Sequence, residues 1–185
     1  MSSPASVGGD ERARLFCALQ LPEEALDALV RWQAGFDLGT ARAVPRENLH
    51  ATLAFLGWTP AAAIPGVVAA LERAAGAAGR IELRPLRYRE TGSVGMLAFE
   101  DVNATGGHLA RDLAARLQRL GVYEPEERGW LAHVTLVRFR RRPGLRPGLP
   151  PGLDAFRVVR AALYRSRLRP GGAQYEVLED VRLGG

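Results

Sequence analysis

Two short stretches of the sequence place a histidine and a threonine at the same spacing. The first is HATL, which begins at His50, and the second is HVTL, which begins at His133. Both lie in apolar runs typical of strands, where side chains alternate between the two faces. His50 and Thr52 therefore share one face of their strand, and His133 and Thr135 share one face of theirs. The sequence predicts two similar half-sites, one in each half of the chain.

Two imidazoles and two hydroxyls that meet across a cleft are suited to splitting a phosphodiester. One imidazole can take a proton from water while the other gives a proton to the leaving oxygen, and the hydroxyls can bind the phosphate oxygens that gain charge. Histidine suits both roles because its unperturbed pKa lies near about 6.5. The residues alone leave open which of His50 and His133 is the acid.

Two other interpretations of these histidines explain less of the pattern. A single His-x-Thr is more often a satisfied polar group at a sheet edge, but that does not account for the second copy. A catalytic zinc ion needs three protein ligands, and neither Cys17, in an apolar run, nor His108, on the polar side of a predicted helix, is a suitable third ligand. We therefore expect no metal site.

The chain carries a formal net charge of +5, and all 25 of its basic residues are arginine. Arginine binds phosphate through paired hydrogen bonds, so the composition favours a nucleotide or RNA partner, although most of these side chains are expected to be ordinary solvated surface. The absence of lysine excludes a P-loop. It also excludes a ligase that carries its nucleotide on lysine.

The sequence predicts a cytoplasmic protein that does not enter a membrane. The first residues lack a basic segment followed by an apolar one, and no run of about 18 apolar residues occurs. The single cysteine, Cys17, is expected to be a buried thiol in a reducing compartment. Residues 1–10 are expected to be a flexible leader.

The hydrophobic pattern predicts strands interspersed with three helices. Gly57 is expected to close the first histidine strand, Pro65 to mark the start of the second helix, and Asn103 or Thr105 to cap the third. The mixed order favours antiparallel sheets over a doubly wound parallel sheet. The predicted strands are residues 14–20, 49–56, 80–90, 94–100, 131–139, 156–166 and 174–181, and the predicted helices are residues 22–36, 60–78 and 105–120.

Four stretches, in order along nearly the whole chain, resemble the 2H phosphoesterase superfamily and, within it, the RNA 2′,3′-cyclic phosphodiesterase family, also called 2′-5′ RNA ligases. They are RLFCALQLP, VPRENLHATLAFLG, RGWLAHVTLVRF and YRSRLRPGGAQYEVL. Two positions depart from the family pattern. Ala43 stands where a tryptophan is common, and Ala132 stands where a proline often precedes the second histidine. These changes alter the strand entries but not the catalytic groups.

This resemblance implies an α+β fold that is bilobal, with two antiparallel β-sheets flanking a central cleft and helices on the outer faces. Residues 11–185 would form it as a single domain. The resemblance also implies a reaction, the opening of a terminal 2′,3′-cyclic phosphate on RNA to a 2′-phosphomonoester without a metal ion, ATP or another cofactor. We expect a monomer that acts on RNA ends.

The resemblance also implies roles for individual residues. His50 would give the proton to the departing 3′ oxygen, and His133 would be the base for water. The two motif threonines would hold the phosphate. Arg138 would add positive charge, although strict alternation along its strand places it on the face opposite His133. Phe16, or a nearby aromatic ring, would stack on the terminal base.

Three other functions fit parts of the sequence. The same groups could run in reverse and join a cyclic phosphate end to a 5′-hydroxyl, although water favours hydrolysis. A small cyclic nucleotide or an ADP-ribose cyclic phosphate could be the substrate. A non-catalytic RNA-binding module would use the arginines alone, would bind with a strong dependence on salt and would not need the histidines.

Overall fold

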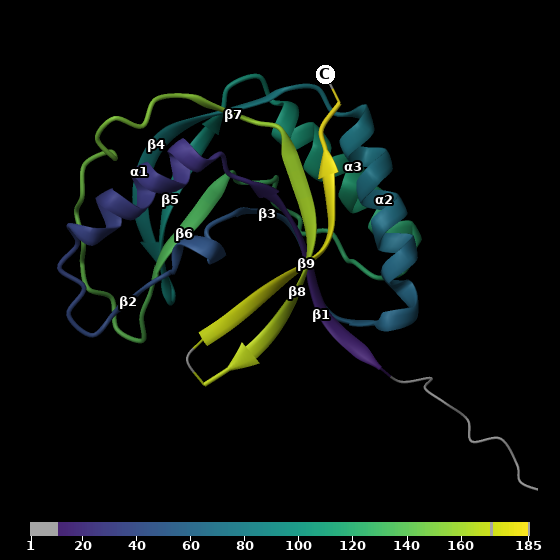
Figure 1. The fold of residues 1–185 in the computed structure, drawn as a ribbon, viewed down its shortest axis with the longest axis horizontal. Helices are drawn as coiled ribbons and strands as arrows, with labels where there is room; N and C mark the ends of the chain where they lie inside the picture. The colour runs from purple at the N-terminus through teal and green to yellow at the C-terminus, as the bar shows by residue number, and fades with distance from the viewer. Residues whose placement is uncertain (1–10, 171, 185) are drawn as a thin grey trace, which may run out of the picture.

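Over the residues that the structure describes, the chain forms two antiparallel sheets with three α-helices packed against them, which confirms the predicted α+β class (Figure 1). The computed structural model describes residues 11–170 and 172–184, so the predicted leader at residues 1–10 lies outside the described residues. The elements are β1 (Arg12–Gln20), α1 (Glu23–Ala34), β2 (Arg42–Ala43), the short 3-10 helix η1 (Arg46–Asn48), β3 (Ala51–Pro60), the 3-10 helix η2 (Ala61–Ala63), α2 (Ile64–Ala77), β4 (Ile81–Thr91), β5 (Val94–Asp101), α3 (Thr105–Arg119), β6 (His133–Arg138), β7 (Phe156–Val158), β8 (Arg160–Arg169) and β9 (Gly172–Arg182).

Each sheet carries one of the two motifs. The first sheet has the strand order β3-β1-β8-β9, and the second has the order β2-β6-β5-β4-β7. Helix α2 lies against the first sheet, α3 contacts strands of both sheets, and α1 lies against the second sheet (Figure 1). Gln33 of α1 fixes that contact, because its side-chain nitrogen donates hydrogen bonds to the carbonyl oxygens of Val44 and Leu136. Because the first motif lies at the start of β3 in one sheet and the second on β6 in the other, the two motifs can meet only between the sheets.

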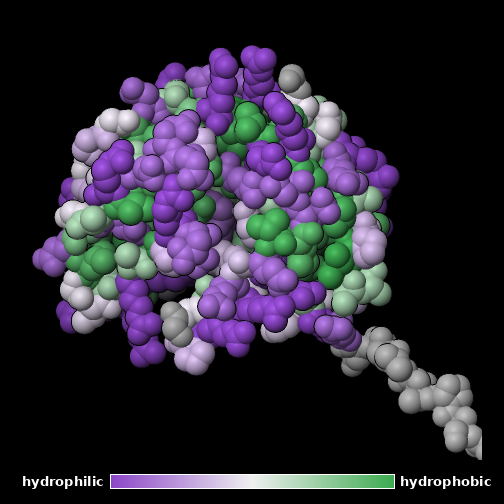
Figure 2. All heavy atoms as spheres, in the orientation of Figure 1, coloured by the Kyte–Doolittle hydropathy of each residue, from purple (hydrophilic) through white to green (hydrophobic). Residues whose placement is uncertain are grey.

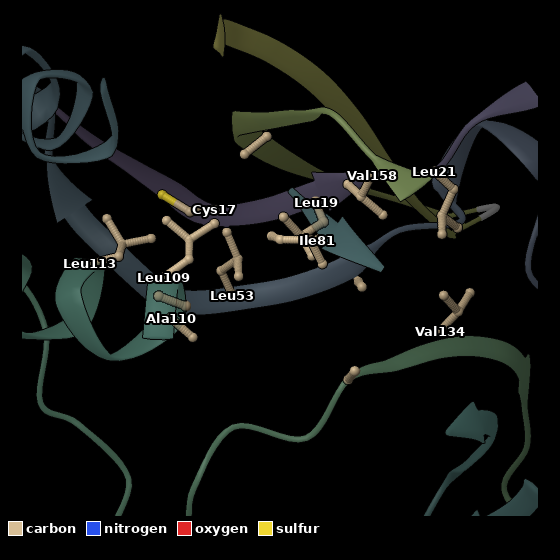
Figure 3. Close-up of a cluster of buried hydrophobic side chains, with 14 of the residues drawn as sticks. Cys17, Leu19, Leu21, Leu53, Ile81, Leu109, Ala110, Leu113, Val134 and Val158 are labelled. Carbon is tan, nitrogen blue, oxygen red and sulfur yellow. The ribbon is translucent and has the colours of Figure 1, made fainter. Parts of the chain in front are cut away.

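A continuous apolar core joins the helices to the sheets. Leu109 and Leu113 on the buried side of α3 meet Cys17 of β1 and Leu53 of β3 (Figure 3). Burial raises the pKa of the Cys17 thiol to about 12, so the thiol stays protonated at neutral pH. The prediction of a buried cysteine is confirmed, and this side chain supplies packing rather than a nucleophile.

The first histidine strand differs from the prediction at both ends. β3 begins at Ala51, directly after His50, and it continues past Gly57 to Pro60. Gly57 has a φ of +68°, and Leu56 has no partner in β1. The prediction that Gly57 ends the strand is therefore wrong. The glycine marks a β-bulge, a place where one extra residue needs the backbone freedom that glycine provides.

The predicted strand over residues 156–166 is in fact two strands in different sheets. β7 pairs with β4 in the second sheet, and β8 pairs with β1 in the first. The exposed residue Val159 lies at the break between them. The apolar alternation is similar on both sides of this residue, so the sequence does not reveal that the chain changes sheet there.

The start of α3 also differs from the prediction. The carboxylate of Asp101 accepts hydrogen bonds from the backbone N–H groups of Gly106 and Gly107, at 3.2 and 2.7 Å. Asn103 accepts only a longer bond of 3.4 Å, from the N–H of Thr105. The main cap is thus Asp101, which the turn after β5 brings back to the helix.

The start of α2 follows the prediction. Pro65 lies in the first turn of the helix, where the missing N–H costs no hydrogen bond. Within residues 11–170 and 172–184, none of the helices is long and apolar enough to cross a membrane.

Candidate active site

The two motifs meet in one open cavity of about 370 Å³ between the sheets. Figure 2 shows a hollow, bordered by hydrophilic side chains, where the β8–β9 hairpin approaches the other half of the molecule. His108 lies elsewhere, exposed on α3. All six site residues predicted from the sequence line the cavity, namely Phe16, His50, Thr52, His133, Thr135 and Arg138.

Each of the two cavity histidines is oriented by a hydrogen bond of the same kind, to the backbone carbonyl two residues earlier. Nδ1 of His50 lies 2.8 Å from the carbonyl oxygen of Asn48, and Nδ1 of His133 lies 2.8 Å from that of Leu131. A carbonyl oxygen can only accept, so Nδ1 is the donor in each ring. In the neutral ring Nε2 is then unprotonated, and it is the atom that can exchange a proton with a substrate.

The ring of His50 rests on other aromatic rings. It stacks on Phe16 with the ring centres 4.8 Å apart, and it meets the ring of Tyr175 nearly at right angles at 5.4 Å. Phe16 is also stacked on Tyr164, at 4.9 Å, and is only 3% exposed. Because its ring is almost fully buried against these neighbours, Phe16 is not free to stack on a terminal base as expected from the sequence. Its position suits support of the imidazole instead.

The pKa of His50 is lowered from its ordinary value to about 4. The main cause is burial, which disfavours the charged ring. The bond to the carbonyl of Asn48 raises the pKa in part, whereas the positive charges of His133 and Arg138 lower it further. His50 is therefore neutral at pH 7 in the free protein. A negative charge placed between the two rings would favour its protonated form.

Arg138 reaches the cavity because β6 is irregular. The register of β6 against β5 shifts between Thr135 and Val137, so Leu136 has no partner and forms a β-bulge. The extra residue changes the face on which the following side chains lie. Arg138 thus lines the cavity together with Thr135, whereas strict alternation along the strand places them on opposite faces.

Trp130 connects the two halves of the site. Its indole nitrogen donates a hydrogen bond of 2.8 Å to the carbonyl oxygen of Thr52, in the other sheet. Its ring lies so close to Gly106 of α3 that a Cβ atom on that residue would be 2.6 Å from it. One side chain from the segment before His133 therefore holds the strand that follows His50.

The other lining residues were not predicted as site residues, and they include Arg14, Phe55, Ser166 and Tyr175. The guanidinium of Arg14 donates a bond of 3.2 Å to the Ser166 hydroxyl and lies 4.8 Å from the ring centre of Phe55. Phe55 is 47% exposed, so it offers the open aromatic surface that Phe16 lacks. The stretches that resemble the family contain all four residues, but only the strand order shows that they are neighbours.

The arrangement can bind an anion and transfer two protons. Arg14 and Arg138 supply positive charge, the two threonines supply hydroxyls, and the two imidazoles present Nε2 atoms. Among the residues that the structure describes, no three histidine, cysteine, aspartate or glutamate side chains gather closely enough to hold a metal ion.

The chain is similar in sequence to a known family and to a curated protein. Residues 19–88 match the family model described as LigT like Phosphoesterase. The chain is 36% identical over 181 residues to the RNA 2′,3′-cyclic phosphodiesterase of Thermus thermophilus, an alignment that spans 93% of this chain and 91% of that protein.

Solved structures share the fold over almost the whole chain. A crystal structure of a Thermus thermophilus protein matches with a TM-score of 0.79 and 32% identity, covering 93% of this chain and 98% of that one. Escherichia coli LigT in its apo form matches with a TM-score of 0.81 and 26% identity, covering 95% and 100%. That protein is also known in complexes with 3′-AMP and with phosphate.

Proposed function

This chain belongs to the LigT-like phosphoesterase family and is a hydrolase of phosphate esters, and we propose that it opens terminal 2′,3′-cyclic phosphates on RNA to give 2′-phosphomonoesters. The observation that carries the proposal is the meeting of two identically bonded imidazoles, His50 and His133, in one cavity. The name of the Thermus thermophilus relative supports the choice of substrate.

In the proposed reaction, water attacks the phosphorus atom of the cyclic phosphate, and the bond from phosphorus to the 3′ oxygen breaks. Nε2 of His133 accepts the proton that the water loses, and Nε2 of His50 gives a proton to the departing 3′ oxygen. One water molecule is consumed, and the phosphate stays on the 2′ oxygen. Proton exchange with solvent returns both rings to their starting states.

Three side chains are placed to stabilise the phosphate as its charge grows. The hydroxyls of Thr52 and Thr135 donate hydrogen bonds to the oxygens that are not part of the ring. Arg138 adds a charge-assisted hydrogen bond, which is stronger than one between neutral groups. The acid, the base and the phosphate contacts all come from the protein, so the proposed reaction requires no cofactor.

Protonation of His50 depends on the substrate in this mechanism. The pKa of the free side chain is about 4, so few molecules carry the donor proton at pH 7 before binding. The cyclic phosphate brings a negative charge between the rings, which offsets the burial and the nearby positive charges. The acid is thus assembled when the substrate enters, while Phe16 keeps the ring in place.

The proposal is tested by incubating the purified protein with a short RNA that ends in a 2′,3′-cyclic phosphate, with EDTA present and without ATP. The products are separated so that 2′-phosphate and 3′-phosphate ends are distinguished. We expect a 2′-phosphate and the same rate with and without EDTA. A 3′-phosphate product, or loss of activity in EDTA, would contradict the mechanism.

Histidine variants test the roles of the two imidazoles. Replacement of His50 or His133 by alanine is expected to lower kcat by about 10²- to 10⁴-fold, the usual contribution of a positioned acid or base. His108→Ala is the matched control, because this third histidine is exposed on α3. Wild-type activity in either His50→Ala or His133→Ala would exclude that residue from the chemistry.

A further inference from the structure

Two arginines face each other at the edge of the second sheet. Arg42 of β2 is the direct partner of Arg138 of β6, and both residues are exposed. Directly paired residues point to the same face, with their Cβ atoms about 4.5–5.5 Å apart, so two like charges there repel and weaken the pairing. The pair is unfavourable unless something negative lies between the two side chains.

A salt bridge does not relieve this repulsion. Arg84 shows the usual arrangement, because it faces Glu100 across β4 and β5 with a nitrogen to oxygen distance of 3.0 Å. Within residues 11–170 and 172–184, neither Arg42 nor Arg138 forms a salt bridge with a carboxylate. The two positive charges are therefore available to an anion from solution.

Arg42 lies on the cavity side of its strand. Val44 follows two residues later in extended chain and so shares its face, and Val44 lines the cavity together with Arg138. The N–H of Val44 donates a bond of 2.7 Å to the carbonyl of Leu136, which continues the pairing of β2 with β6. Two neighbours of Arg42, one along the chain and one across the sheet, thus place it at the rim of the active site.

We propose that Arg42 binds a second phosphate of the RNA, the internucleotide phosphodiester on the 5′ side of the terminal nucleotide, and shares it with those N–H groups of Arg138 that do not contact the terminal cyclic phosphate. This inference rests on the proposed function, because it takes the terminal cyclic phosphate to lie between His50 and His133. A guanidinium binds phosphate oxygens through parallel hydrogen bonds, and two adjacent guanidinia can hold one anion between them. The pair selects an RNA end over a cyclic mononucleotide, which has no second phosphate.

The test compares kcat/KM on two substrates. One is adenosine 2′,3′-cyclic phosphate, and the other is the dinucleotide ApA ending in a 2′,3′-cyclic phosphate, which has one internucleotide phosphate. The wild type should prefer the dinucleotide, and Arg42→Gln should reduce this preference about tenfold, the effect of one hydrogen bond to a charged group. Arg119→Gln, at the exposed end of α3, is the matched control and should keep the preference. An unchanged preference in Arg42→Gln would overturn the proposal.

A binding measurement separates this inference from the proposed function. The affinities of adenosine 2′-phosphate and of ApA 2′-phosphate are measured by calorimetry at several salt concentrations, which requires no turnover. The wild type should bind the dinucleotide more tightly, and in Arg42→Gln the slope of log affinity against log salt should be shallower by about 0.7, the loss of one phosphate contact. If neither substrate reacts but this preference depends on Arg42, the proposed function fails and the phosphate site stands. A preference that is independent of Arg42 overturns the site.

The stability of Arg42→Gln provides a further check. Because the substitution removes a repulsion between directly paired charges, the Tm without ligand should not fall. Inorganic phosphate should raise the Tm of the wild type by more than it raises the Tm of the variant, since the wild-type pair binds the anion. A lower Tm without phosphate would show that Arg42 stabilises the sheet edge and would contradict the premise.

Discussion

The two half-sites share a motif and a hydrogen bond, but they differ in their surroundings. In both, Nδ1 of the histidine bonds at 2.8 Å to the carbonyl oxygen two residues earlier. His50 stacks on Phe16 and meets Tyr175, whereas among the described residues no aromatic ring stacks on His133. The bond of His50 is partly buried and that of His133 is exposed. The motif orients the ring, and the neighbouring strands decide how deeply the ring is buried.

This difference has a chemical consequence. Burial lowers the pKa of His50, so at pH 7 this ring is mostly neutral until a negative charge lies beside it. His133 lies at the more open side, where water can approach. When two groups of the same type lie in different environments, their pKa values differ, and one can then donate a proton while the other accepts one.

Thr52 and Thr135 have the same proposed role in the two half-sites, so replacing either one should lower kcat by a similar factor. Thr52→Val and Thr135→Val keep the shape of the side chain but remove the donor, so each should lower kcat by about 10²- to 10³-fold. Steady-state kinetics on an RNA cyclic phosphate measure the loss. The matched controls are Thr52→Ser and Thr135→Ser, which keep a hydroxyl. Serine variants as impaired as the valine variants would show that the hydroxyl is not what matters.

Phe16 belongs to one half-site only: its ring stacks on His50, and among the described residues no ring stacks on His133. Phe16→Leu should lower kcat about tenfold by letting the imidazole move away from the leaving oxygen, with a smaller effect on KM. Phe99→Leu is the matched control, since Phe99 is equally buried but contacts Phe156 in the second sheet. If both variants lost the same activity, the effect of Phe16 would reflect stability alone.

The protonation of His50 should respond to a bound anion. In a histidine NMR titration of the free protein its pKa should be about 4, and saturating adenosine 2′-phosphate should raise it by about one to three units. The signal of exposed His108 serves as the internal control and should not respond to the ligand. A His50 pKa that does not change on binding would contradict its role as the acid.

The smallest expected effect concerns stability and pH. Because the pKa of His50 is lowered to about 4 in the folded protein, the unfolded chain binds more protons between about pH 6.5 and 4. This residue therefore makes the fold less stable as the pH falls through that range. Between pH 7 and 4.5 the Tm of His50→Gln should fall by less than the Tm of the wild type. The Tm of His108→Gln should fall by as much as that of the wild type. Parallel curves for all three proteins would contradict the lowered pKa.

The pairing of the two motifs could be predicted from the sequence because its signal is local. His50 and Thr52 share a face through the alternation of an extended chain, and the same pattern at His133 and Thr135 makes chance a poor explanation. The cavity brings all four together. Cys17 was likewise predictable as buried, because an apolar run on both sides indicates the core.

The features that could not be predicted depend on partners distant in the chain. Arg138 faces the cavity only because β6 bulges at Leu136 against β5, and the bulge is a property of the pairing. Phe16 stacks on Tyr164, which lies near the other end of the sequence. The strand at residues 156–166 divides at Val159 because its two parts find partners in different sheets. In each case the deciding neighbour is set by tertiary structure.

The central claim, that two imidazoles from two sheets divide the roles of acid and base, is tested most directly with a sulfur-substituted substrate. Replacement of the 3′ oxygen of the cyclic phosphate by sulfur gives a leaving group that needs no proton, because a thiol has a pKa near about 8.5. His50→Ala, which is impaired on the oxygen substrate, should recover nearly wild-type rates on the sulfur substrate, while His133→Ala should stay impaired on both. Recovery of His133→Ala in place of His50→Ala would contradict the account.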